Sequence, residues 1–251
     1  MYLWKYWRES RILFGISLLA IVILTIAILR EHLGGSGHSG NAQLFQVWSV
    51  FLVLQILPLC FVAWIFGSFG VGRDLGERSG SFIFSRPQNR AWFIWRDWGF
   101  GMAQLLIITI CFNLAGWLQV HRVLVAMDGS SREIILSHSG PASTLTAVAA
   151  LSAFLLAALV FSLTYFSTIL IKNARGLFLS AGVFLGYLVL CMVVKHYWQV
   201  ELPSLLLQPF AHANPMSGGI ADHLSMAVTI RAILVLIFPF AAQFTLDRAD
   251  I

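Results

Sequence analysis

Six long apolar runs constrain the fold of this chain more than any other feature of its sequence. A helix needs about 20 consecutive apolar residues to cross the hydrocarbon core of a membrane. Six segments are near or above this length, at residues 12–29, 44–70, 99–120, 145–171, 177–194 and 226–246. Charged residues make up only 11% of the 251 residues, against about 25% in soluble domains. The sequence therefore predicts an all-α integral membrane protein with six transmembrane helices in one domain, residues 1–251.

The basic residues predict how these helices are oriented. Lys and Arg collect on the cytoplasmic side of membrane proteins, so the net charge of +5 needs no nucleic-acid partner. Most of the 16 basic residues lie in the two terminal segments, in residues 72–97 and in residues 172–175. This distribution predicts cytoplasmic termini in a multi-pass protein that contacts membrane lipids. Residues 1–11 alternate aromatic and basic side chains, which fits an interfacial amphipathic helix or an aromatic anchor for the first span.

The connection at residues 195–225 is predicted to be extracytoplasmic. Pro203, Pro209 and Pro215 interrupt its apolar residues, which predicts re-entrant or interfacial helices before the sixth span. All seven histidines fall on or near this outer side. They leave open an alternative function, an ATP-independent membrane scaffold or a metal- or haem-handling protein. No histidine pair has tight ligand spacing, so no metal site is predicted.

Residues 72–97 form a charged connection between the second and third runs. Residues 74–84 fit a short helix, because Leu75, Phe82 and Ile83 share one face at helical spacing. Pro87 ends this helix, and a second helix is predicted to restart near Ala91. Such a cytoplasmic helix could dock a soluble partner, or it could be a solvated loop of the positive-inside kind.

This connection resembles the signature region of ABC-2 type permeases, the membrane subunits of one class of ATP-binding cassette exporters. The family pattern has an acidic residue, Gly-Thr or Gly-Ser, an apolar stretch and Ser-x-Pro-x-x-Arg. The matching residues here are Glu77, Gly80, Ser81, the apolar residues 82–84 and the segment 85–90, Ser-Arg-Pro-Gln-Asn-Arg. The spacing from Gly80 to Pro87 is shorter than in the family, so either Asp74 or Glu77 fills the acidic position.

The resemblance implies a coupling helix that rests on a cytoplasmic ABC ATPase in an export complex. Two permease copies, or this chain and a homologue, would form a dimer in a bacterial inner (plasma) membrane. The implied coupling residues are Asp74, Glu77, Arg78, Gly80, Phe82, Arg86, Pro87 and Arg90. Lys172 and Arg175 would make a second, smaller contact, although residues 172–176 also fit a tight positive-inside turn.

The chain itself is predicted not to be an enzyme. It contains no G-x-x-x-x-G-K-[ST] sequence, so it would bind no cofactor directly, and ATP and Mg would belong to the partner ATPase. Polar residues within the runs could line a translocation path or form hydrogen bonds between helices. They are Gln55, Gln104, Asn113, Thr164 and Gln243. Arg231, the one charge inside a run, is expected either to snorkel to the outer headgroups or to contact an anionic substrate or lipid.

Overall fold

The computed structural model describes residues 2–34, 56, 58–76, 90–126, 142–173, 175–198 and 220–248. These residues form helices and turns, and none of them lies in a strand. The all-α prediction is therefore confirmed for this part of the chain.

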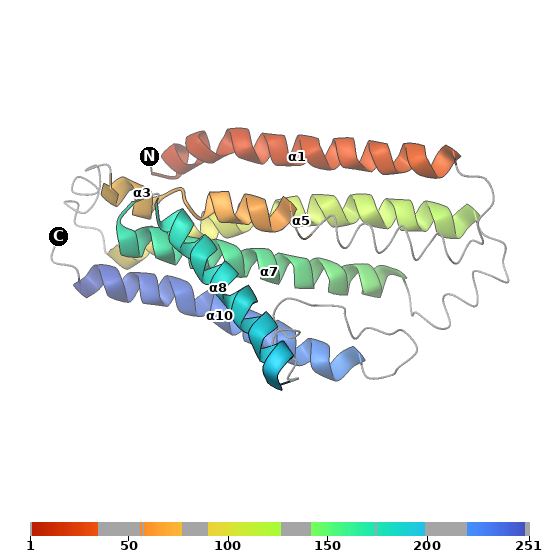
Figure 1. Ribbon diagram of the computed structural model, residues 1–251. Helices are drawn as coiled ribbons and strands as arrows, with labels where there is room; N and C mark the ends of the chain where they lie inside the picture. The colour runs from red at the N-terminus through yellow and green to blue at the C-terminus, as the bar shows by residue number, and fades with distance from the viewer. Residues whose placement is uncertain are drawn as a thin grey trace.

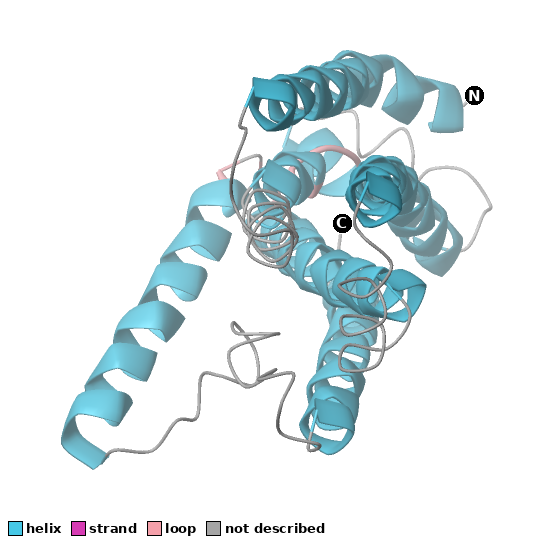
Figure 2. Ribbon diagram, turned by 90° about the vertical axis from the view of Figure 1, so that its right-hand side faces the viewer, coloured by secondary structure: helices cyan, strands magenta, loops and turns pink. Residues whose placement is uncertain are grey.

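In the described part of the chain, the five long helices are α1 (Tyr2–Gly34), α5 (Arg90–Ala126), α7 (Ala142–Ile171), α8 (Gly176–Trp198) and α10 (Ile220–Arg248). Of these, α1, α5, α7 and α10 run lengthwise in an elongated bundle and α8 crosses it obliquely (Figure 1). Helical residues 58–66 and the short α3 (Val71–Gly76) precede α5. Helix α8 packs on α7 and then diverges obliquely from the other helices (Figure 2).

Three helices of the described chain are long and apolar enough to cross a membrane. These stretches are Ala91–Ala115, Ala150–Ile171 and Val228–Arg248, in the third, fourth and sixth apolar runs. Helices α1 and α8 cover the first and fifth runs, and helical residues 58–66 lie within the second. Many large apolar side chains of the long helices face outward, such as Ile16, Phe178 and Phe240. An apolar exterior of this kind is compatible with a membrane protein.

One end of the bundle gathers the segments on either side of the charged connection. Helix α3, the beginnings of α1, α5 and α8, and the ends of α7 and α10 all lie there (Figure 1). We call this the hinge end. The segments whose Lys and Arg residues predicted a cytoplasmic position all have their described parts at this end.

Helix α7 forms the centre of the bundle. In its apolar stretch 61% of the residues are buried, against 33% in α5 and 22% in α10. Small buried residues, among them Ala153, Ala157 and Ser162, let neighbouring backbones approach closely, as is common between membrane helices. One apolar cluster joins α7 to α1, residues 58–66 and α5, and a second joins it to α3, α5 and α10.

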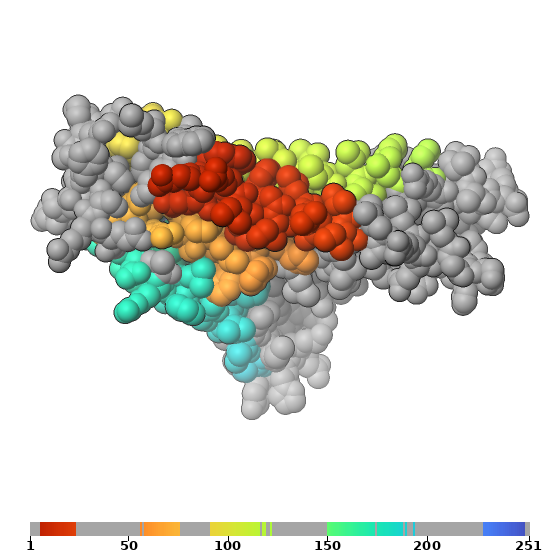
Figure 3. Space-filling view, turned by 90° about the horizontal axis from the view of Figure 1, so that it is seen from above, coloured from red at the N-terminus to blue at the C-terminus, as the bar shows by residue number. Residues whose placement is uncertain are grey.

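The N-terminal segment is not a separate helix. Residues 2–11 are the first turns of α1, which continues without interruption through the first apolar run. Tyr6 and Ser10 are buried, and the Tyr6 ring packs edge to face on Phe100 with centroids 5.3 Å apart. Figure 3 shows α1 lying along residues 58–76 and α5.

The charged connection is described only at its two ends. The predicted helix of residues 74–84 begins earlier, since α3 starts at Val71, and its last described residue is Gly76. Helix α5 begins at Arg90, which confirms the predicted restart near Ala91. Residues 77–89 lie outside the described part of the chain.

Candidate functional site

The beginning of α3 is held by a carboxylate from α5. The Val71 N–H donates a hydrogen bond to Asp97 Oδ2 at 2.9 Å, and both residues are fully buried. Gly70 immediately before it has a φ of 94°, a left-handed conformation that favours glycine. A Cβ at Gly70 would also collide with the Asp97 carboxylate. Glycine at position 70 thus lets Asp97 reach the first turn of α3.

The segment on either side of Gly70 also lies directly against the α7 backbone. A Cβ on Gly72 would come within 2.7 Å of the Thr168 carbonyl carbon and hydroxyl oxygen. A Cβ on Gly67 would come equally close to the Phe161 carbonyl oxygen. The Thr168 hydroxyl lies between two carbonyl oxygens that can share its proton, that of Tyr165 at 2.8 Å and that of Gly67 at 3.3 Å. This close contact leaves the chain before α3 little room to slide along α7.

Two buried tyrosines join further helices at the same place. The Tyr6 hydroxyl of α1 donates to the Phe66 carbonyl at 3.4 Å, and the Tyr165 hydroxyl of α7 donates to the Ile94 carbonyl of α5 at 3.3 Å. Burial, and to a smaller extent the charges of Asp97 and Glu9, raises the pKa of Tyr6 well above its ordinary value. The phenol therefore keeps the proton that it donates.

We call these residues the anchor cluster. Its members are Tyr6, Gly70, Val71, Asp97, Tyr165 and Thr168. Through them α1, α3, α5 and α7 share polar contacts at the hinge end, next to both ends of the charged connection.

The turn between α7 and α8 is tied to the same assembly. Helix α7 ends in a Schellman motif, in which the N–H groups of Lys172 and Asn173 bond to the carbonyls of Ile169 and Thr168. Lys172 has a φ of 54°, in the position that glycine usually occupies in this motif. At the start of α8, the Trp64 indole N–H donates to the Leu177 carbonyl and the Ser180 hydroxyl, each at 3.1 Å.

The residues predicted to contact an ATPase have different surroundings in the structure. Asp74 on α3 is only 3% exposed, so it belongs to the interior of the hinge end. Lys172 and Arg175 are exposed on the α7–α8 turn, and Arg90 begins α5. Six further residues lie outside the described part of the chain: Glu77, Arg78, Gly80, Phe82, Arg86 and Pro87.

The residues predicted to line a path lie at separate helix contacts. Gln104 on α5 donates to the Ser10 hydroxyl of α1 at 2.9 Å, and Asn113 donates to the Thr109 carbonyl of its own helix. The hydroxyl of Thr164 on α7 is 3.1 Å from that of Ser180 on α8. Gln243 on α10 accepts from the Trp95 indole of α5 at 3.1 Å. Three of these residues thus make hydrogen bonds between helices, as expected if they serve helix packing. Gln55 lies outside the described residues.

The snorkelling alternative for Arg231 was wrong, and sequence reasoning did not identify Asp97. Arg231 does not snorkel, because its side chain is 0% exposed and donates to the Ser152 hydroxyl at 2.7 Å. The position of Arg231 within the sixth apolar run showed that its charge is unusual, but the sequence did not indicate that Ser152 on α7 is its partner. Asp97 precedes the third run and was grouped with the charged connection. The neighbouring tryptophans Trp95 and Trp98 were the only sequence signal that this stretch enters the bundle.

A metal site finds no support in the described residues. No group of three or more His, Cys, Asp or Glu side chains among them could hold a metal ion. Of the histidines only His121 has a described side chain, and it stacks on the Trp117 ring with centroids 5.2 Å apart. Cys60 and Cys111 are free thiols, each partly buried.

The chain was compared with models of protein families, with curated proteins and with solved structures, and nothing in any of the three matches it.

Proposed function

We propose that this chain is the transmembrane permease subunit of an ABC exporter, with six spans and both termini in the cytoplasm. The observation that carries the proposal is the position of the charged connection. Its pattern, Ser-Arg-Pro-Gln-Asn-Arg at residues 85–90, resembles the permease signature and lies between α3 and α5. The anchor cluster holds both of these helices against the rest of the bundle.

The proposed mechanism transmits motion through packed helices. A displacement of residues 77–89 would act on α3 and on the beginning of α5. The bond from Val71 to Asp97 makes these two helices move together, and the contacts of Gly67 and Gly72 with α7 pass the displacement to the bundle centre. Close-packed contacts of this kind transmit rigid-body motion because they leave no slack.

The proposal requires partners that supply chemistry the chain lacks. A separate cytoplasmic ABC ATPase would bind ATP and Mg and close around them. A second permease copy or a homologue would complete the translocation pathway. The exposed Lys172 and Arg175 would make the smaller ATPase contact, while the chain itself would catalyse no covalent step.

Charge reversal in the connection tests the proposal directly. The variant Glu77→Lys/Arg86→Glu/Arg90→Glu is purified from native membranes in mild detergent beside the wild-type chain. We expect an ATPase with a nucleotide-binding motif to co-purify with the wild type, identified by mass spectrometry, and to be lost from the variant. The control, Arg122→Glu/Arg132→Glu, reverses charges on the predicted outer side and should retain the ATPase.

Two outcomes would contradict the proposal. One is a wild-type chain that is well folded and reproducibly purifies without any ATPase. The other is a triple variant that keeps both the ATPase and substrate-stimulated ATP hydrolysis. In either case the connection would be a solvated positive-inside loop.

A further inference from the structure

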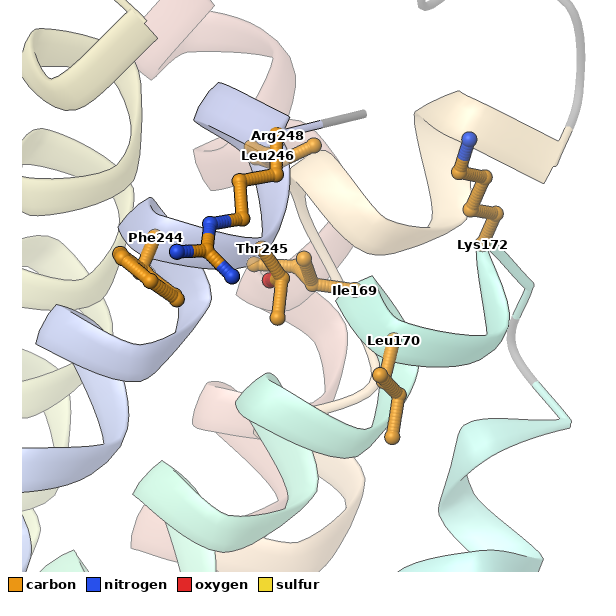
Figure 4. A pocket seen from close by; sticks show the side chains of 7 residues that line it. All are labelled: Ile169, Leu170, Lys172, Phe244, Thr245, Leu246 and Arg248. Atoms are coloured by element: carbon orange, nitrogen blue, oxygen red, sulfur yellow. The ribbon is translucent and has the colours of Figure 1, made fainter. Parts of the chain in front are cut away.

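A surface pocket lies between the ends of α7 and α10 at the hinge end. Its volume is about 390 Å³, and Figure 4 shows the side chains around it. The lining residues are Ile169, Leu170, Lys172, Phe244, Thr245, Leu246 and Arg248. Two of the seven are cations, one from each helix end, and none is acidic.

The charges and the apolar surface of this pocket are divided by depth in the membrane. Lys172 directly follows the apolar stretch Ala150–Ile171, and Arg248 is the last residue of Val228–Arg248. The walls on the membrane side include Leu170 and Phe244, which are 50% and 55% exposed. A ligand in the pocket would thus meet positive charge at the headgroup level and apolar side chains below it.

Both cations are available to a ligand. The Arg248 guanidinium lies over the Phe244 ring, 4.0 Å from its centroid, and Lys172 is placed by its left-handed backbone in the Schellman motif. Neither makes an ion pair with an acidic side chain in the described residues. Asp247 is next to Arg248 in sequence but does not line the pocket.

We propose that this pocket binds one anionic phospholipid. Figure 4 shows the Arg248 guanidinium turned toward Phe244 and the Lys172 ammonium turned away from the pocket. Both flexible side chains would swing inward to contact the headgroup phosphate, and one acyl chain would lie along Leu170 and Phe244. Basic pockets between helix ends on the cytoplasmic side suit acidic headgroups. The lipid site shares Lys172 with the smaller ATPase contact of the proposed function. Lipid binding by the purified chain requires neither an ATPase nor transport, so the two proposals are tested by separate measurements.

Lipid titration followed by native mass spectrometry tests the site. The full chain is delipidated in mild detergent, and phosphatidylglycerol or phosphatidylcholine is added. We expect one tightly bound phosphatidylglycerol per wild-type chain and weaker binding of phosphatidylcholine. The loss of each cation should weaken the affinity for phosphatidylglycerol about fivefold. The double variant Lys172→Gln/Arg248→Gln should therefore bind this lipid roughly 25-fold more weakly than the wild type.

The matched control removes two other cations at the same end. Arg8 and Arg11 are exposed on α1 and do not line the pocket, so Arg8→Gln/Arg11→Gln should change the affinity less than about twofold if attraction is local. An equal loss in both double variants would show diffuse surface attraction and overturn the proposal. So would equal affinity of the wild type for the two lipids.

A second measurement on the wild-type chain avoids any folding defect of the variants. Phosphatidylglycerol with a photoreactive group in its acyl chain is bound and activated, and the labelled residues are identified. We expect labelling at Leu170 and Phe244. Labelling confined to other helices would overturn the site. Displacement of the lipid by a co-purified acidic protein segment would assign the pocket to that protein instead.

Discussion

Asp97 holds the first residue of α3 through a single carboxylate oxygen. The variant Asp97→Ala leaves the buried Val71 N–H without this acceptor, which costs about 1–3 kcal/mol. Asp97→Asn keeps an oxygen acceptor at the same position and replaces the carboxyl group with a neutral amide of nearly the same shape. We therefore expect Asp97→Ala to lower the midpoint of thermal unfolding in detergent by about 2–4 °C for each kcal/mol. The midpoint of Asp97→Asn should stay near that of the wild type.

Comparison of the two variants shows whether the acceptor oxygen of Asp97 stabilises the hinge end. If the unfolding midpoint of Asp97→Asn fell as far as that of Asp97→Ala, some property of the carboxyl group other than its acceptor oxygen would stabilise the hinge end. If neither variant changed the midpoint, the bond to Val71 would not hold α3. In the proposed exporter complex, the loss of this bond should also reduce transport more than ATP hydrolysis, because α3 and α5 would no longer move together.

Arg231 donates a short hydrogen bond to the hydroxyl of Ser152 on the central helix and a longer one to the carbonyl of the same residue. Ser152→Ala removes the acceptor at 2.7 Å, and hydrogen bonds to charged groups contribute about 1.5–3 kcal/mol. We expect a lower unfolding midpoint in detergent. The control is Ser17→Ala, whose hydroxyl donates to the Leu13 carbonyl of its own helix, so the midpoint should fall less. Equal changes would mean that the Ser152 hydroxyl contributes no more than an ordinary local bond.

At the scale of elements, the contact of α3 with α7 depends on the absence of a side chain at Gly72. Gly72→Ala places a methyl group 2.7 Å from Thr168 backbone and side-chain atoms. Because the backbone must then shift, we expect destabilisation of about 1–3 kcal/mol, measured by thermal unfolding. Gly99→Ala within α5 is the control, since nothing lies within 4 Å of its Cβ position. It should be neutral or stabilising, because alanine favours helices more than glycine does. Equal destabilisation by both variants would contradict the close contact.

The sequence predicted the elements better than it predicted their contacts. Long apolar runs determine where a helix lies, and the described helices fall on those runs with somewhat longer ends. No local pattern indicates which face of a helix meets which neighbour. For that reason the burial of Asp74 and Arg231, and the link between Asp97 and Val71, could not be predicted. The partners Val71 and Asp97 are 26 positions apart in the chain, and Arg231 and Ser152 are 79 apart. The turn at Gly70 has a conformation that follows from the tertiary contact.

At the scale of the whole molecule, the bundle separates a polar end from an apolar exterior. The anchor cluster, the α7–α8 turn and the pocket between the ends of α7 and α10 all lie at the hinge end, where the charged connection begins and ends. Helix α8 instead diverges from the bundle away from this end (Figure 2). A motion applied at the hinge end would thus reach helices that are tightly joined there.

The proposed topology makes one prediction about the intact cell. Asn173 lies exposed on the α7–α8 turn, after four proposed spans, while Ser36 follows the first. Single cysteines are introduced at these positions after Cys60, Cys111 and Cys191 have been replaced. A membrane-impermeant thiol reagent should label Ser36→Cys in intact cells and Asn173→Cys only after permeabilisation, because an odd number of spans separates them. The chain without cysteines should not be labelled.

Labelling of both positions from one side would contradict the six-span arrangement, whereas exchanged labelling would keep the six spans and reverse their orientation. The second result would place the hinge end outside the cell, where no cytoplasmic ATPase could reach it.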